Sequence, residues 1–519
     1  MLLVTVLALL SLATSIYAST HYIHPPPSIP PIVDLGYALY QGTFNATANT
    51  TDFLGIRYAA SPTGVQKADA LPTGCPQASF GVNISTPFRS SNKSDNVPRR
   101  EPAADPEDCL FLNVFVSGSL NSRAKMPVIV WFHGGGYVAE STQGFNGDDL
   151  IREGGGGLVV VTMDYRLGVF GFLAGAEVKR KGALNAGLLD QQAALQWVRK
   201  NIHLFGGDPN EVTIWGESAG GGSVIQHMIA NGGQTRPSLF KGGMSSSLFM
   251  PSQYQFDDPI SEEIYSEFVR LTGCTHAKDS FDCLTKVDGE TLQQANVEIN
   301  NSGFFGSFVV VPVVDGEFIR SSPTEQLLKG PLNGERLLMM TNTFEGTILV
   351  NANFSVEMTV ADYVTQLFPK FNAQQIAYAT ALYTNDTSLE TTNDKAIAIM
   401  GESILICPTY LVLQSFKGPA FKGEFAVPPG THVSDVPYYF PNGTAPPFSN
   451  PQFDASFAGA FTAFAKSGDP NKHPVSRIMT PEWNTFSQNS TEMLFNRTED
   501  FRPDIRPIST DSDLLKRCE

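Results

Sequence analysis

Three continuous apolar runs stand out in the first half of the chain. They are KMPVIVWF at residues 125–132, GLVVVTMDY at residues 157–165 and EVTIWGES at residues 211–218. Such runs, apolar throughout rather than alternating, are typical of strands buried on both faces of a mainly parallel sheet. Between the second and third, residues 188–202 place apolar side chains near helical spacing and contain no Gly or Pro. This order predicts a strand, a crossover helix and a strand.

Two more strands are predicted at residues 239–247 and 335–343, and residues 33–44 contain short strand-like pieces. Asn- and Pro-rich connections from residue 362 onward are interpreted as excursions that decorate the sheet. No internal repeat or low-complexity linker divides the chain. The pattern predicts one α/β domain, with a large, mixed, mostly parallel sheet flanked by helices and carrying long decorating loops.

The N-terminal segment MLLVTVLALLSLATSIYA is apolar, too short for a comfortable membrane span, and ends in small residues near Ala18. We interpret residues 1–18 as a secretory signal peptide and residues 19–519 as the mature domain. No Lys or Arg precedes the apolar run, so a buried strand or an uncleaved anchor stays open as an alternative. No later stretch is apolar for about twenty residues, which predicts a soluble, extracellular protein without stable membrane insertion.

Secretion makes the cysteines informative, because disulfides persist in oxidising compartments. The six are Cys75, Cys109, Cys274, Cys283, Cys407 and Cys518. No C-x-x-C pair or Cys/His cluster of zinc-ligand spacing occurs, so we expect three disulfides and no metal site. Numerous N-x-[ST] sequons predict a glycosylated surface.

The charge balance excludes some classes of partner. The formal net charge is -16 and the sequence pI is near 5.0. Nucleic acid and anionic membranes are not expected as partners, because phosphate binding needs a basic face. Four glycines at residues 154–157 are not followed by G-K-[ST], and no H-E-x-x-H occurs, so no nucleotide, metal or organic cofactor is implied.

The pentapeptide GESAG, residues 216–220, places Ser218 directly after the third predicted strand and before a Gly/Ala-rich helix start. A strand-to-helix bend tight enough to expose the serine hydroxyl requires small residues on both sides, and the two glycines supply them. G-x-S-x-G also arises by chance, but its placement on a strand, turn and helix favours a nucleophilic serine.

A serine nucleophile needs a base, and in this order of elements both partners follow the serine. Four of the eight histidines precede Ser218, and His227 lies too far along the same predicted helix. His276 falls in a short loop between two cysteines and His473 in an exposed turn. His432, between a Pro/Gly loop and an aromatic, strand-like run, is therefore the predicted base, against the alternative of a surface-loop histidine.

The third member of such a site is an acid that orients the imidazole, and the candidates are Asp315 and Glu345. Glu345 follows the more strand-like run and is preferred. The glycines of HGGG at residues 133–136 close the first strong strand and let backbone N–H groups approach an oxyanion. The N–H of Ala219 would add another donor.

These motifs resemble the type-B carboxylesterase family, the α/β-hydrolases that include cholinesterases and a group of fungal lipases. The resemblance runs from about residue 33 to the C-terminus and is most specific in NAGLLDQQAALQWVRKNIHLFGGDPNEVTIWGESAGG. It implies a secreted serine carboxylic-ester hydrolase that forms an acyl-enzyme intermediate. The residues implied are Ser218 as nucleophile, Glu345 as acid, His432 as base, and Gly135, Gly136 and Ala219 as oxyanion hole. It also implies three disulfides, Cys75 to Cys109, Cys274 to Cys283 and Cys407 to Cys518.

The segment between Cys75 and Cys109 limits the substrate. It contains no Trp, which disfavours a cation–π choline site. Its apolar residues show no helical stripe typical of an amphipathic lid; they include Phe80, Val82, Ile84, Phe88 and Val97. Soluble or short-to-medium acyl esters are therefore favoured over the lipid-like esters of an interfacially activated lipase or sterol esterase. A non-catalytic cholinesterase-like adhesion module is a remote alternative, since all three catalytic candidates are present.

Overall fold

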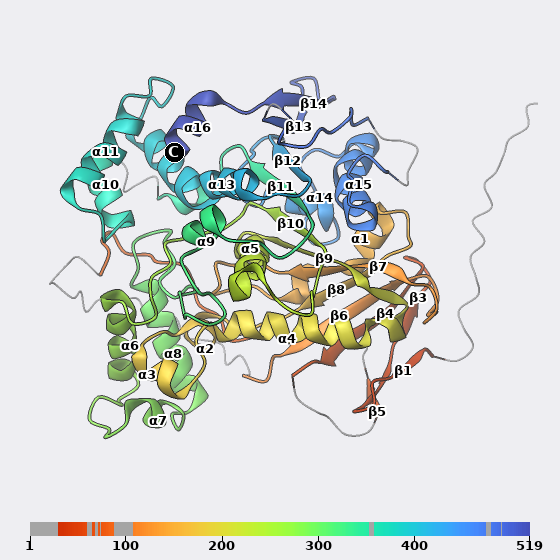
Figure 1. Cartoon of the computed structure of the whole chain (residues 1–519), viewed down its shortest axis with the longest axis horizontal. Helices are drawn as coiled ribbons and strands as arrows, with labels where there is room; N and C mark the ends of the chain where they lie inside the picture. Colours follow the sequence, from red (N-terminus) through yellow and green to blue (C-terminus); the bar gives the residue numbers. More distant parts are fainter. Residues whose placement is uncertain are drawn as a thin grey trace, which may run out of the picture.

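The computed structural model describes residues 30–59, 65–67, 71–72, 74–87, 107–351, 358–473, 479–488 and 490–519. The signal peptide predicted at residues 1–18 lies outside these ranges, as do Phe88 and Val97 of the segment in which no lid is expected. The described residues fold around an eleven-stranded sheet, and a three-stranded sheet lies near the N-terminal end (Figure 1).

The strands are β1 Ile32–Asp34, β2 Leu39–Gln41, β3 Thr43–Asn45, β4 Thr50–Arg57, β5 Val65–Lys67, β6 Phe111–Ser117, β7 Met126–Phe132, β8 Val159–Met163, β9 Gly207–Glu217, β10 Gly242–Ser246, β11 Arg336–Asn342, β12 Ala420–Phe425, β13 Thr491–Arg497 and β14 Pro503–Ser509. The α-helices are α1 Gly147–Glu153, α2 Gly168–Phe172, α3 Ala176–Lys181, α4 Ala186–Asn201, α5 Ala219–Gly233, α6 Pro259–Leu271, α7 Ser280–Leu284, α8 Gly289–Asn301, α9 Pro323–Lys329, α10 Val360–Leu367, α11 Ala373–Thr384, α12 Thr392–Gly401, α13 Cys407–Ser415, α14 Val436–Tyr439, α15 Pro451–Ser467 and α16 Ser512–Cys518.

The large sheet has the strand order β14-β13-β12-β11-β10-β9-β7-β8-β6-β4-β3. The strands from β13 to β8 pair in parallel, and antiparallel strands flank them on both sides. The predicted crossover helix is α4, which connects β8 to β9 across β7. The predicted large, mixed and mostly parallel sheet is therefore confirmed.

Both faces of the sheet are covered, which explains the continuous apolar runs. Along β7, Val128 and Val130 point into one core, whereas Ile129 and Trp131 point into the other. Helices α4 and α5 cover the first face, and α1 and α15 cover the second (Figure 1). A central strand between two helical layers has no polar face, so its sequence cannot alternate.

The expectation that residues from 362 onward only decorate the sheet is wrong in part. Strands β12, β13 and β14 come from this region and extend the sheet beyond β11. The sequences of β12 and β13, AFKGEF and TEMLFNR, carry the charged residues Lys422 and Glu492. These charges interrupt the apolar pattern by which the other parallel strands are recognised.

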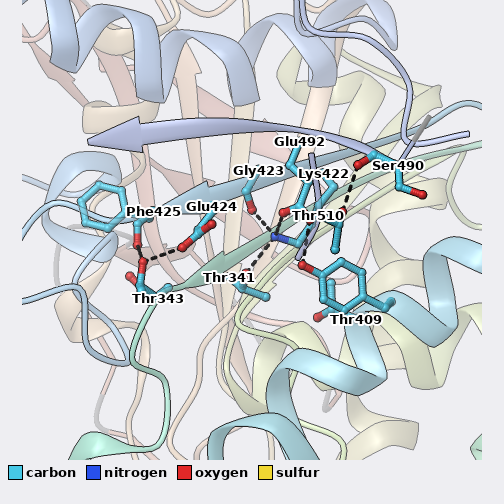
Figure 2. A network of polar contacts seen from close by, with 12 residues as sticks. Thr341, Thr343, Thr409, Lys422, Gly423, Glu424, Phe425, Ser490, Glu492 and Thr510 are labelled. Atoms are coloured by element: carbon cyan, nitrogen blue, oxygen red, sulfur yellow. Dashed lines mark hydrogen bonds and ion pairs between the residues drawn. The ribbon is translucent and has the colours of Figure 1, made fainter. Parts of the chain in front are cut away.

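Lys422 and Glu492 form a fully buried ion pair between β12 and β13 (Figure 2). The ammonium of Lys422 lies 2.8 Å from Glu492 and also donates to the hydroxyl of Thr341 and the carbonyl of Gly423. Tyr410 donates to the other carboxylate oxygen. Burial favours the neutral acid, but the charge and hydrogen bonds of Lys422 outweigh it and lower the pKa of Glu492. The pair locks β12, the strand that leads to His432, to its neighbours.

The aromatic run after His432 is also not the expected strand-like segment, because Val436–Tyr439 forms helix α14. Tyr439 is buried and stacks on Phe457 of α15, while its hydroxyl donates to Asp435. Tertiary packing of the rings thus overrides the β-propensity of the aromatic residues.

One long apolar helical stretch, Thr392–Ser415, contradicts the expectation that no later segment is apolar over that length. It joins α12 and α13 through the π-helical turn Glu402–Ile406. By length and composition it could cross a membrane, but 67% of its most apolar window is buried inside the protein. That burial is what a core helix requires, and the stretch packs against α9, α10 and β11.

All six cysteines are paired in the structure, and the pairs are the three that the family resemblance implies. The first bridge anchors both ends of the segment between Cys75 and Cys109. The third ties α13 to the C-terminal helix α16. Three disulfides fit an oxidising compartment.

Candidate active site

Ser218 lies in the bend between the central strand β9 and helix α5. Its backbone has φ 53° and ψ -120°, a conformation that costs free energy for a residue with a Cβ. The bend is held because the Ser218 N–H donates to the Ser246 carbonyl at the end of β10, at 3.0 Å. The strained bend places the hydroxyl beyond the C-terminal end of β9, within 2.9 Å of His432 Nε2.

The two glycines of GESAG are required by close backbone approach. A Cβ on Gly216 would overlap the backbone of Gly220, and a Cβ on Gly220 would overlap the carbonyl of Phe132 in β7. Any larger residue at either position would push the bend out of the sheet. The structure therefore supplies the steric reason for the small residues around Ser218.

Ser218, His432 and Glu345 lie together in a continuous hydrogen-bonded chain. His432 Nε2 is 2.9 Å from Ser218 Oγ, and His432 Nδ1 is 2.7 Å from Glu345 Oε2. The second oxygen of Glu345 accepts a 2.7 Å hydrogen bond from the N–H of Asn342 at the end of β11. All three side chains are buried. With the imidazole proton on Nδ1, His432 donates to Glu345 and accepts from Ser218.

The competing sequence candidates lie elsewhere. Asp315 is buried, but its carboxylate accepts hydrogen bonds from Asn185, Glu317 N and Ile319 N and holds a turn. His276 is exposed in the turn between α6 and α7, inside the Cys274–Cys283 loop. His473 lies after α15, beside Gly459. Within the part of the chain that the structure describes, no hydrogen bond or ion pair joins any of them to Ser218.

The glycine turn after β7 faces the same bend. Gly135 and Gly136 both have positive φ, 81° and 63°, which glycine adopts without the cost of a Cβ. Their N–H groups and that of Ala219, the first residue of α5, donate no hydrogen bond to any residue that the structure describes. Three free backbone donors beside a serine hydroxyl are an arrangement that can stabilise an oxyanion.

Two further carboxyl groups, which the sequence reasoning did not single out, lie close to His432. Glu217 Oε1 is 3.4 Å from His432 Nε2, and the carboxyls of Glu217 and Glu140 both approach Gly134. Burial, then the charges of Glu140, Asp435 and Glu345, raise the pKa of Glu217 well above its usual range. Glu217 occupies the first variable position of G-x-S-x-G. Its position directly before Ser218 was the sequence signal that could have placed it at the site.

Asp435, three residues after His432, is a third buried carboxyl near the site. It accepts hydrogen bonds from Asn342 at 3.1 Å and from Tyr439 at 2.9 Å. Burial raises its pKa to about 6, and the nearby Glu345 charge acts in the same direction. Asn342 thus contacts both Asp435, through its side chain, and Glu345, through its backbone.

An apolar cavity lies beside the serine. Phe249 and Phe308 line it, with their rings edge to face at 5.0 Å. The N–H of Phe249 donates to the Ser218 carbonyl, and a Cβ on Gly136 would overlap the Phe308 ring. Through Phe249 and Phe308 the cavity therefore borders the Ser218 bend and the glycine turn. Its other walls are mainly apolar and include Ile260, Ile264, Val309, Phe368, Met400 and Ile404.

This sheet, with a strained serine at the end of a central strand and a histidine and carboxylate on later loops, defines an α/β-hydrolase. The chain belongs to the Carboxylesterase family, whose family model matches residues 30–506. It is therefore a carboxylic ester hydrolase of the carboxylesterase and lipase family of serine hydrolases, and the predicted family and fold are confirmed.

Curated relatives include both esterases and lipases. The chain is 32% identical over 512 residues to "Carboxylesterase patB" of Aspergillus clavatus, covering 87% of this chain and 90% of the relative. It is 33% identical over 352 residues to "Secreted lipase 1" of Botryotinia fuckeliana, covering 62% and 61%. Relatives named as secreted lipases, together with the disulfides, point to an extracellular protein.

Solved structures share the fold. Aspergillus niger EstA superposes with a TM-score of 0.80 at 28% identity, covering 94% of this chain and 97% of the other. A structure described as PNB esterase gives a TM-score of 0.73 at 22% identity, covering 95% and 100%. The second likeness speaks for the fold alone.

Proposed function

We propose that the protein is a secreted serine carboxylesterase in which Ser218 is the nucleophile, His432 the general base and Glu345 the acid that orients the imidazole. The observation that carries this proposal is the chain of two hydrogen bonds, 2.9 Å and 2.7 Å, that links these side chains at the strained bend. The N–H groups of Gly135, Gly136 and Ala219 form the oxyanion hole.

The reaction proceeds through an acyl-enzyme. His432 Nε2 takes the hydroxyl proton as Ser218 Oγ bonds to the ester carbonyl carbon, and the carbonyl oxygen becomes an anion held by backbone N–H groups. The imidazolium returns the proton to the leaving alkoxide, so an alcohol departs. Water then attacks the acyl-enzyme with His432 as base, and the carboxylic acid and free Ser218 are formed.

The apolar cavity supports an ester with an acyl chain that is short or of medium length. Phe249 and Phe308 line the cavity where it borders Ser218 and Gly136, so a short acyl group is expected to pack against these two rings. The expected partner is therefore a small, soluble ester; nucleic acid and stable membrane insertion are not expected.

A lipase acting on lipid-like esters is the second candidate, because apolar side chains next to the site are exposed. Phe344 is 55% exposed and directly precedes Glu345, and Val433, 38% exposed, directly follows His432. Ile348 is 47% exposed two residues beyond Gly346. Apolar residues grouped at a substrate entrance favour contact with an aggregated substrate.

We further infer that residues 1–18 are removed on secretion and that residues 19–519 form one domain. The large sheet supports one domain, because it contains strands from residue 43 to residue 509 of the chain. Exposed sequons such as Asn49 and Asn385 are the expected glycan sites. Asn300 is not one of them, because it is 1% exposed and its amide donates to Asn296.

The test is hydrolysis of p-nitrophenyl esters from acetyl to palmitoyl, below and above their solubility limits. Ser218→Ala is expected to lower kcat/KM by about 10⁴-fold or more, as loss of a nucleophile does. Ser388→Ala, which changes an exposed serine far along the chain, is the matched control and should leave the rate unchanged.

Chain-length dependence then separates the two candidates. A maximum at short chains without a jump above the solubility limit supports the carboxylesterase, whereas a long-chain maximum with a jump supports the lipase. Full activity of Ser218→Ala in a clean preparation would remove the nucleophile assignment.

A further inference from the structure

A pocket with an unusual charge lies at the end of α5 opposite Ser218. It is formed by three segments: the second half of α4, the turn after α5, and the segment before α9. Both α4 and α9 pack against α5 (Figure 1). Asn231, near the end of α5, lines the pocket, and the helical residues 219–229 alone separate it from the Ser218 bend by about 15 Å. The pocket is thus separate from the candidate active site.

Four cationic side chains line this pocket, and no Asp or Glu among the described residues does. They are Arg199 and Lys200 from α4, Arg236 from the turn after α5, and Arg320 from the segment before α9. None of the four forms an ion pair with a residue that the structure describes, in contrast to the Arg166–Asp190 and Arg517–Glu402 pairs elsewhere.

The hydrogen bonds of these side chains hold them at the pocket without neutralising them. Arg199 donates to the carbonyl of Ser238, and Arg236 and Arg320 donate to the carbonyls of Thr235 and Glu317. Each guanidinium keeps further N–H groups available, because it carries five donors.

Helix ends account for only part of this charge. Arg199 and Lys200 lie in the last turn of α4, where a cation complements the partial negative charge of about half a unit at a helix C-terminus. The C-terminal ends of α4 and α5 together carry about one unit of partial negative charge. The four side chains carry four positive charges, so most of this charge is not balanced by the helix ends. In a chain with a net charge of -16, the pocket is thus locally positive by about three charges, which attracts an anion.

We propose that this pocket binds an oxyanion with two or more negative charges, of the phosphate or sulfate class. Arginine forks match the paired oxygens of such groups, and the pocket draws its arginines from three separate segments, so that they can surround one anion. Amide side chains add neutral donors: Gln192 lines the pocket and its buried side-chain oxygen has no partner among the described residues. A rotated amide would present its N–H groups instead. The proposal is independent of the ester chemistry at Ser218.

The test is isothermal titration calorimetry of the glycosylated, disulfide-bonded protein with inorganic pyrophosphate at pH 7 and constant ionic strength. Arg236→Gln combined with Arg320→Gln is expected to weaken binding about tenfold or more, because charge-assisted hydrogen bonds are lost. Arg123→Gln combined with Lys417→Gln removes the same two charges from exposed positions elsewhere and is expected to bind as the wild type does. Ester hydrolysis by both double variants should match the wild type, which shows that they are folded.

Parallel titrations identify the source of the anion. Binding of pyrophosphate alone assigns a free polyanion, and equal binding of glucose 6-phosphate assigns a phosphate group carried on an organic molecule. Acetate, with one charge, is expected not to bind. Absence of binding by the wild type, or equal weakening in the two double variants, would overturn the proposal and leave a nonspecific charge effect.

Discussion

Replacing Glu217 by Gln changes the charge state beside His432 while keeping the shape of the side chain. Glu217 is 2% exposed, and its Oε1 has no hydrogen-bond partner among the described residues. Burial and the carboxyls of Glu140, Asp435 and Glu345 raise its pKa well above 4.5. We therefore expect Glu217 to be a neutral carboxylic acid when the enzyme works near neutral pH.

The magnitude follows from the distance between Glu217 and His432. A unit negative charge 3.4 Å from Nε2 would favour the protonated imidazole by about 5 kcal/mol at an effective dielectric constant of about 20. Such a free energy corresponds to a change of about three to four units in the pH at which the imidazole loses its proton. A neutral carboxyl contributes no such term. The two protonation states of Glu217 thus predict different pH profiles for the Gln variant.

The assay is kcat/KM for a soluble p-nitrophenyl ester between pH 4 and pH 9. In Glu217→Gln the acid limb is expected to move by less than about half a pH unit, because a neutral acid is replaced by a neutral amide. Asp454→Asn is the control, since burial raises the pKa of Asp454 to about 6 on α15, away from His432. A downward move of the acid limb by about two units or more in Glu217→Gln would show that Glu217 is charged and refute the reasoning.

Three other perturbations test separate parts of the structure. Phe308→Ala removes the ring beside Gly136 and is expected to shift the preferred acyl chain to greater length, measured as kcat/KM over the p-nitrophenyl series; an unchanged preference would place the acyl chain elsewhere. Lys422→Met leaves Glu492 buried without its partner and is expected to lower the free energy of unfolding by about 3–5 kcal/mol in urea titrations, whereas adding Glu492→Leu should restore most of the loss. Burial and the neighbouring Asp148 raise the pKa of Asp52 to about 7, so the folded state holds this proton more tightly and the contribution to stability present at acid pH is lost as the pH rises through about 7. Asp52→Asn should therefore gain in Tm relative to the wild type between pH 5 and pH 8, and parallel curves for the two proteins would contradict this.

The parallel strands that could be predicted are those whose local sequence already matches their burial. β7 and β8 are apolar throughout because both faces are covered, so the sequence alone indicates them. β12 could not be found in this way, because Lys422 is compatible with a buried position only when Glu492, seventy residues later, supplies the counter-charge. A buried strand whose charge is neutralised by a residue far away in the sequence cannot be predicted from its local pattern.

The same distinction holds at the candidate site. Ser218 and the HGGG turn could be predicted from the sequence. Their tight backbone turns require glycine, and the glycines lie next to these residues in the sequence. The position of Phe308 leaves no such signal, because the ring reaches Gly136 only after folding brings together segments that are far apart in sequence. Gly136 meets two constraints: its φ is positive, and its missing Cβ makes room for the Phe308 ring beside the N–H that we propose for the oxyanion hole. One glycine that sequence reasoning assigns to transition-state stabilisation thus also fixes how closely an aromatic wall can approach the ester.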